Sequence, residues 1–161
     1  MKTFLLSIAL LFSTTTIGLS QNMDNEKLGE IFELLSDTII GGPGNWRMMI
    51  ADVPMICITD QFANRMRIVS PIKPVADSSD EEIMACMEAN FHTSLDVRYS
   101  ISEGIICTAF IHPLAELTDE QVLDAIAQIY AASKTYGTEY TSTNFVFPKK
   151  EEGNKRRVKK N

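Results

Sequence analysis

Few side chains in this sequence are suited to act as nucleophiles, acid–base catalysts or metal ligands. The chain has two histidines, His92 and His112, and three cysteines, Cys57, Cys86 and Cys107. A zinc site needs three or four such ligands close together, and a hydrolase needs a nucleophile beside a histidine that a third group orients. The short motifs typical of these sites do not occur in the sequence. We therefore predict no catalytic residue, no metal site and no cofactor.

The nearest approach to a catalytic pair is Cys107 with His112. These residues are five positions apart on one predicted strand, residues 105–114. Because side chains of a strand alternate between its two faces, this separation places them on opposite faces. The alternative hypothesis is an enzyme or a small-ligand-binding protein with an unrecognised site that uses Cys107, His112 or His92.

The three cysteines are predicted to be buried thiols. Each has apolar neighbours, and their spacing is too long for a redox or zinc motif. An odd number of cysteines leaves at least one unpaired even in an oxidising compartment. A disulfide between Cys57 and Cys107, on neighbouring predicted strands, is the alternative.

Basic side chains offer a better candidate for a binding site. Residues 65–69 alternate strictly between charged and apolar side chains, so Arg65 and Arg67 project from one face of a predicted strand. Two adjacent cations suit an acidic segment or an anion. The alternative is a solvated sheet face that nearby Asp60 and Asp96 balance.

Two further residues complete the candidate site. Arg98 alternates with apolar residues on another predicted strand, and both Arg98 and Arg47 are expected to face outward. Trp46 begins the first predicted strand. A tryptophan offers a large contact area to a partner, although packing in the core is its alternative role. The candidate partner-binding residues are therefore Arg65, Arg67, Trp46 and Arg98.

Charge is distributed unevenly along the chain. Residues 24–148 hold nineteen acidic and seven basic side chains, a net charge of −12. A domain with this net charge should repel the phosphates of nucleic acids, which argues against a nucleic-acid-binding domain, and we expect no nucleic acid partner. Residues 149–161 hold seven basic and two acidic side chains, without apolar periodicity, and are predicted to form a disordered basic tail. This tail either lies over its own acidic domain or contacts an anionic surface.

The first twenty residues have the pattern of a secretory signal peptide. Lys2 precedes an apolar run from Phe4 to Phe12, and small residues precede Gln21. The run is too short for a membrane-spanning helix, which needs about 20 mostly apolar residues. We expect cleavage after Ser20, export to the periplasm or beyond the cell of a bacterium, and no transmembrane anchor afterwards. The mature chain would be one domain, residues 21–148, followed by the tail at 149–161.

Apolar periodicity predicts helices and strands in a simple order. Helices are expected at residues 24–38, from a cap at Ser79 or Asp80, and from a capping box at Thr118 to Gly137. Strands are expected at residues 46–52, 54–60, 65–69, 95–102 and 105–114. Residues 41–45 are rich in glycine and are expected to form a flexible connector, and Pro71 and Pro74 are expected to end the third strand.

The element order and several segments resemble the YbjN-type domain, a member of the type III secretion chaperone-like fold. The segments that carry the resemblance are residues 64–72, the hairpin at 95–101 and 110–114, and the last helix from 117–120 to 136–138. It implies one α+β domain, in the order α-β-β-β-α-β-β-α, with helices packed on an antiparallel sheet. It also implies frequent homodimers and a non-enzymatic role in protein or peptide binding, and it supplies no catalytic residue. We therefore expect an exported binding or adaptor protein.

Overall fold

The computed structural model describes residues 22–143. Three α-helices, a short 3-10 helix and six strands follow one another along the chain. Their bounds are α1 Asn25–Leu35, β1 Thr38–Gly42, β2 Asn45–Ile50, β3 Val53–Asp60, β4 Arg65–Pro74, η1 Val75–Asp77, α2 Asp80–His92, β5 Arg98–Ser102, β6 Ile105–His112 and α3 Asp119–Thr135.

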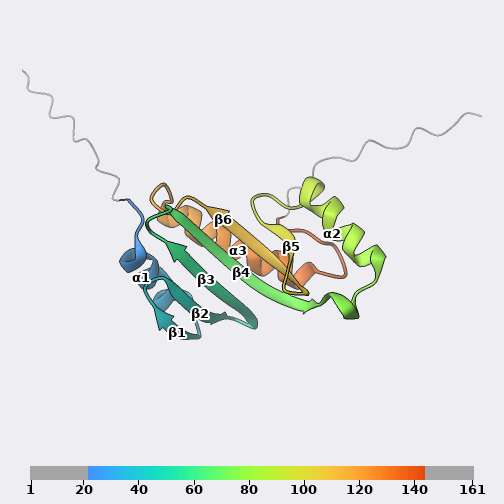
Figure 1. The fold of residues 1–161 in the computed structure, drawn as a ribbon, viewed down its shortest axis with the longest axis horizontal. Coiled ribbons are helices and arrows are strands. Elements are labelled where there is room, and N and C mark those ends of the chain that lie inside the picture. The colour runs from blue at the N-terminus through green and yellow to red at the C-terminus, as the bar shows by residue number, and fades with distance from the viewer. Residues whose placement is uncertain (1–21, 144–161) are drawn as a thin grey trace, which may run out of the picture.

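All six strands belong to one antiparallel sheet with the order β1-β2-β3-β4-β6-β5. The first four strands form a meander, and the β5–β6 hairpin joins it through β6 (Figure 1). The connection from β4 to β5 runs through η1 and α2. The sheet therefore has two edges, β1 and β5.

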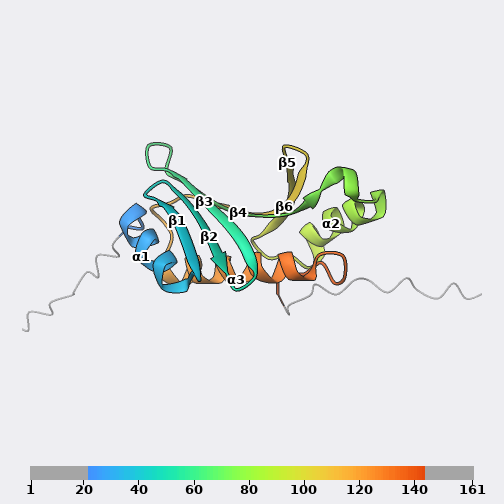
Figure 2. The ribbon, with the colours of Figure 1, turned by 90° about the horizontal axis from the view of Figure 1, so that it is seen from below.

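The helices leave one face of the sheet uncovered. Figure 2 shows α1 and α3 on one side of the sheet and α2 beyond its β5 end. An ion pair of 2.7 Å between Lys27 Nζ and Asp119 Oδ1 joins α1 to the start of α3. No described helix lies on the other side of the sheet, which we call the open face (Figure 2).

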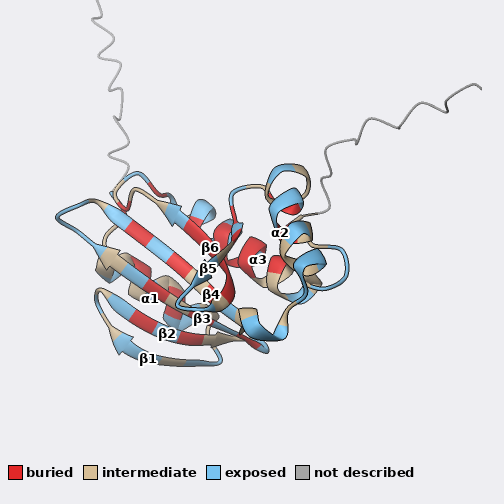
Figure 3. Cartoon of the chain, turned by 45° about the vertical axis from the view of Figure 1, so that its right-hand side comes forward, coloured by how far each residue is buried: buried red, intermediate tan, exposed pale blue. Residues whose placement is uncertain are grey.

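The core lies between the sheet and α1 and α3. Along β3 and β4, buried residues alternate with more exposed ones (Figure 3). Met55, Cys57, Met66 and Ile68 are each at most 1% exposed and point toward the helices. This period of two is what a half-covered antiparallel sheet requires.

Gln128 fixes α3 to the segment that leads into β5. Its side chain is buried, and its Oε1 accepts hydrogen bonds from the backbone N–H groups of Asp96 at 3.0 Å and Val97 at 3.4 Å. Its Nε2 donates to carboxylate oxygens of Asp124 at 2.6 Å and Asp96 at 3.3 Å. One buried amide thus satisfies backbone donors that would otherwise lack partners.

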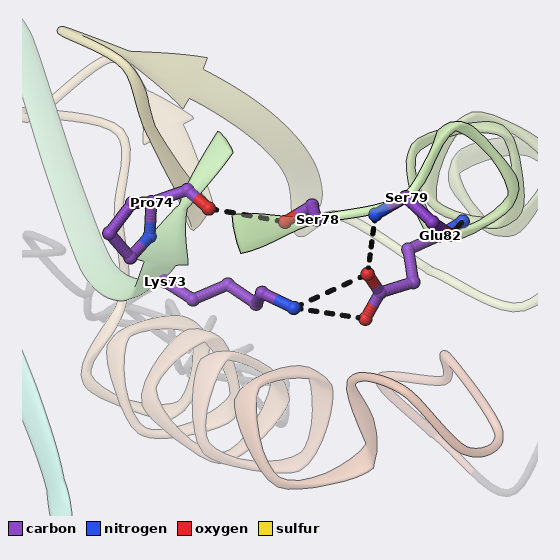
Figure 4. Close-up of polar contacts among 5 residues, drawn as sticks. All are labelled: Lys73, Pro74, Ser78, Ser79 and Glu82. Carbon is purple, nitrogen blue, oxygen red and sulfur yellow. Dashed lines mark hydrogen bonds and ion pairs between the residues drawn. The ribbon is translucent and has the colours of Figure 1, made fainter. Parts of the chain in front are cut away.

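The start of α2 is fixed to the end of β4 by a capping box and an ion pair (Figure 4). Ser79 Oγ accepts from Glu82 N at 3.2 Å, and Glu82 Oε2 accepts from Ser79 N at 2.8 Å. The same carboxylate accepts from Lys73 Nζ at 3.2 and 3.3 Å. Lys73 also lies 5.8 Å from the ring centroid of Tyr136, at the end of α3. The Glu82 carboxylate therefore takes part in both the capping box of α2 and the ion pair with Lys73 that connects α2 to β4.

The predicted fold class is confirmed, and so are the capping box of α3 and, of the two caps considered for α2, Ser79. The structure adds one strand, β1, where we expected the end of the first helix and a flexible connector. The helix ends at Leu35, and β1 and β2 form a hairpin around a turn at Pro43 and Gly44. Gly41, within β1, has φ at 99°. A side chain at Gly41 would place its Cβ 2.2 Å from the carbonyl oxygen of Asn45, so only glycine fits there.

Two further expectations are corrected. Strand β4 does not end at Pro71 but runs to Pro74, pairing with β6 through a register shift between Pro71 and Lys73. The prolines are tolerated because the paired register of β3 stops at Val69, so this part of β4 has only one partner strand. The Cys57–Cys107 disulfide does not form, since all three cysteines are free and buried. The predicted signal peptide, residues 1–20, and the predicted basic tail, residues 149–161, lie outside the described residues.

Candidate partner-binding face

The strand register shows which side chains share the open face. One row crosses all six strands through directly paired residues. Its members in sheet order are Ile40, Arg47, Ile56, Val69, Ala109 and Arg98. Apolar residues thus form the middle of the row, and an arginine lies toward each end.

A second row lies two residues further along the strands. Asn45 pairs with Ile58, Ile58 with Arg67, and Arg67 with Ile111. Ile58 is 49% exposed and Ile111 is 56% exposed. Beyond this row, Asp60 pairs with Arg65. The open face therefore combines exposed isoleucines with cationic side chains.

Lysines and arginines behave differently in the described part of the chain. Each of its three lysines forms an ion pair: Lys27 with Asp119, Lys73 with Glu82, and Lys134 with Asp52. None of its four arginines forms an ion pair with a described carboxylate. All four arginines, Arg47, Arg65, Arg67 and Arg98, start from the open face and are exposed.

Only one carboxylate shares the open face by register among the described strands, and that is Asp60. Its Oδ1 accepts a hydrogen bond of 2.9 Å from Ala63 N in the following turn. Asp96 and Asp124, which lie outside the strands, line a hollow together with Arg98. Arg47, Arg65 and Arg67 outnumber Asp60 on the rest of the face and give it a positive charge, whereas residues 24–148 carry −12. The open face is thus the cationic surface of an acidic body.

Three of the four predicted site residues lie together on this face, and one does not. Arg65, Arg67 and Arg98 are exposed on it, although Arg98 turns its guanidinium back to donate to the carbonyl oxygens of Val97, at 2.8 Å, and Leu95. Trp46 is on the opposite face, 2% exposed, with its ring 5.4 Å from that of Phe32. Trp46 is therefore a core residue. Its neighbour Arg47, which the candidate set omitted, lies on the open face instead.

An open hollow of about 370 Å³ lies at one end of the face. Its lining includes Ile58, Asp60, Arg65, Arg67 and Ile111. Apolar and cationic groups are therefore accessible together at one place. Such a mixture suits a peptide side chain better than a buried cofactor, which needs an enclosed pocket.

The thiols and histidines do not assemble into a reactive site within the described residues. Burial raises the pKa of Cys57 to about 12, and burial followed by the charge of Glu82 raises the pKa of Cys86 to about 11. Protonated thiols are poor nucleophiles. Cys107 is buried and interacts with Ser100, while His112 Nδ1 lies 2.8 Å from the carbonyl oxygen of Pro113.

Within residues 22–143, no group of three or more histidine, cysteine, aspartate or glutamate side chains is placed to hold a metal ion. None of the helices in that range is both long and apolar enough to cross a bilayer. The described residues form two exposed apolar regions, and the open face is one of them.

The second exposed apolar region lies on α2 and β5. Met84, Met87 and Phe91 on α2 are 59%, 61% and 75% exposed, and Ile101 on β5 is 55% exposed. Between α2 and the β5–β6 hairpin is a hollow of about 130 Å³ whose lining includes Met87 and Ile101. A cluster of this kind commonly marks a contact with another protein.

Two solved structures show the same fold. A chain in the structure of the HopA1–SchA chaperone–effector complex superposes with a TM-score of 0.52 and 13% identity, covering 68% of this chain and 88% of that one. A chain in the crystal structure of the ExsC–ExsE complex gives a TM-score of 0.52 and 14% identity, covering 71% and 94%. No protein-family model matches the chain, and no curated protein matches it. These similarities confirm the chaperone-like fold and, at such low identity, the fold alone.

Proposed function

We propose that this protein is a non-enzymatic binding or adaptor protein that holds a segment of a partner protein on the open face of its sheet. The observation that carries the proposal is that the lysines and the arginines of the described residues differ in whether they form ion pairs. Every described lysine is in an ion pair, whereas all four described arginines lie on the helix-free face without one. Arginine is favoured at protein interfaces because its planar guanidinium binds carboxylates and stacks on apolar groups.

The fold is compatible with this proposal. One neighbour of this fold occurs in a complex described as chaperone–effector, so a domain of this shape is compatible with binding another protein. Residues 26–142 resemble the YbjN-type domain, and this resemblance also favours a protein-binding role. We propose that the chain is a member of that group.

Cross-linking and purification from cells that naturally express the protein tests the proposal. A variant with Arg47→Gln and Arg67→Gln should lose the partner that the unchanged protein retains. The control variant, Lys27→Gln with Lys134→Gln, removes the same charge from paired sites on α1 and α3 and should retain it. Recovery of the protein alone, or equal loss of the partner in both variants, would contradict the proposal.

We further propose that two copies of the chain pair through the apolar cluster on α2 and β5. Residues 84, 87 and 91 follow helical spacing, and a twofold axis would let this surface bury itself against its own copy. Sedimentation analysis of Met87→Glu should show a monomer where the unchanged protein is a dimer. Leu34→Glu, at an 84% exposed site on α1, should leave the dimer intact. A monomeric unchanged protein would refute this pairing.

Export and the basic tail are proposals that depend on the sequence alone. The pattern of residues 1–20 supports secretion, and the charge of residues 149–161 supports contact with an anionic surface. Mass measurement of the mature protein should give an N-terminus at Gln21. Deleting residues 149–161 should release the protein from anionic vesicles, and unchanged binding after that deletion would rule out the contact.

A further inference from the structure

The turn between β3 and β4 displays an aromatic side chain that the fold does not use. Phe62 is 105% exposed, the highest value among the exposed large apolar residues that the structure describes. It lies in the turn at Gln61–Asn64, which rises from the sheet on the side away from the helices (Figure 2). Burial of a phenylalanine stabilises a protein, so full exposure leaves its apolar surface free for a contact outside the chain.

This turn is held in place firmly. Asn64 adopts a left-handed conformation with φ at 50°, and its Nδ2 donates to both carboxylate oxygens of Glu116, at 3.1 and 2.9 Å. Its Oδ1 accepts from Ala115 N at 2.8 Å. At the other end of the turn, Asp60 accepts from Ala63 N at 2.9 Å. Phe62 is therefore presented on a braced support, which lowers the entropy that a contact would cost.

The braced turn borders the hollow on the open face. Ala63, next to Phe62, lines that hollow together with Ile58, Arg65 and Arg67. The two arginines are alternate residues of β4, so their starting points are about 6.5 Å apart, the repeat of any extended chain. A peptide in strand conformation presents alternate side chains at the same repeat. Carboxylates two residues apart on such a peptide therefore match the two guanidinium groups.

We propose that this end of the open face is a specificity site for an extended segment with acidic side chains at alternate positions and an apolar side chain beside them. Arg65 and Arg67 bind the carboxylates, and Phe62 with Ile58 and Ile111 covers the apolar side chain. The inference rests on the proposed function and adds the chemistry of the segment that is bound.

Charge favours this occupant over two others. A second copy seated on the open face, and not on the apolar surface of α2 and β5, would bring residues 24–148 of two chains together there, each with a net charge of −12, and these repel one another at moderate salt. An anionic bilayer laid against the open face meets the same repulsion, which contact through residues 149–161 does not require. A short acidic segment carries less negative charge than a second copy of the chain or a bilayer, so the acidic domain repels it less. Its carboxylates can contact the arginines of the open face directly. Each carboxylate that it places there meets a guanidinium without a carboxylate partner among the described residues.

Fluorescence anisotropy with a labelled peptide in which Glu alternates with Val tests the inference. We expect saturable binding to the unchanged protein that weakens as salt rises, and weak binding of the matched peptide with Gln in place of Glu. Arg65→Gln with Arg67→Gln should weaken binding of the acidic peptide about tenfold, a loss of about 1.4 kcal/mol in binding free energy. Phe62→Ser should weaken binding of the same peptide about fivefold.

Matched variants control for total charge and for exposed apolar area. Lys27→Gln with Lys134→Gln and, separately, Leu34→Ser should bind as the unchanged protein does. Circular dichroism should show that all variants are folded, as expected for exposed sites. Equal binding of the Glu and Gln peptides would overturn the acidic specificity while leaving the open face as a binding surface. Lack of binding by either peptide would also overturn it.

The other occupants give distinct results, each of which would overturn the inference. A concentration-dependent dimer that Arg65→Gln with Arg67→Gln abolishes would identify a second copy. Binding to anionic vesicles that Phe62→Ser abolishes would identify a membrane. The proposed function fails separately, if a partner cross-linked in cells is retained when the arginines of the open face are changed.

Discussion

Arg67 on β4 lies directly opposite Ile111 on β6, on the face of the sheet that α1 and α3 do not cover. Both side chains are exposed, and Ile58 flanks Arg67 from the other side. A water-facing sheet surface usually carries mainly polar side chains, whereas this one interleaves isoleucine with arginine. The relationship distinguishes the open face from a merely solvated one and makes it the centre of the functional proposal.

Removing the Gln128 side-chain amide should destabilise the protein. Gln128→Leu leaves the backbone N–H groups of Asp96 and Val97, the latter buried, without their side-chain acceptor, so we expect a loss of about 2–3 kcal/mol in the free energy of unfolding. Urea unfolding measures it. Leu123→Ala, at a 43% exposed site on the same helix, is the control and should cost much less. Equal costs would contradict the assigned role of the amide.

Two substitutions at Asn64 separate its backbone from its side chain. Asn64→Ala loses the bonds to Glu116 and Ala115 and also strains the left-handed backbone, so we expect it to cost about 2 kcal/mol. Asn64→Gly loses the same bonds but tolerates the conformation, so it should cost less. Thermal unfolding of both variants checks the order, and a more stable alanine variant would contradict it.

Sequence patterns predicted most of the fold because its signals are local. Alternation over residues 65–69 placed Arg65 and Arg67 on one face, and the caps at Ser79 and Thr118 are short-range contacts. Strand β1 was missed because Ile39 also fits the helical spacing before it, and only pairing with β2 identifies the strand.

The candidate site was predictable only in part. Alternation shows that Trp46 and Arg47 point in opposite directions, but which direction faces the helices depends on the tertiary packing of Phe32 against Trp46. That Arg47 and Arg98 belong to one row depends on strand pairing through the three residues between them, Ile56, Val69 and Ala109. The isolation of the arginines from carboxylates is a three-dimensional property as well.

Stability should depend on pH through Glu82. The Ser79 N–H, followed by Lys73, holds the pKa of this carboxyl below its usual value of 4.5. A lowered folded-state pKa stabilises the protein above pH 4.5, and this contribution disappears as the pH falls through the folded-state value. Glu82→Gln keeps a capping group, as Gln121 does in α3, but removes the charge. The stability difference between the two proteins should therefore shrink from pH 7 to pH 3, and parallel profiles would contradict this account.

The buried thiols should be unreactive in the folded protein. Because burial raises the pKa of Cys57 to about 12, a thiol reagent at pH 8 should label this residue only after unfolding. Mass spectrometry after timed labelling measures this directly. Ser102→Cys, at an exposed site on β5, should be labelled quickly as the control. Rapid labelling of Cys57 in the native protein would contradict its burial.

The central claim is that the open face, and not the helical side, contacts the partner. Photo-cross-linking tests it most directly, with benzoylphenylalanine at Ile58 on the open face or at Leu123 on α3, which are 49% and 43% exposed. We predict that the position 58 probe forms a discrete adduct with a partner protein in cells that naturally express the chain, and that the position 123 probe forms none. An adduct at position 123 without one at position 58 would contradict the claim.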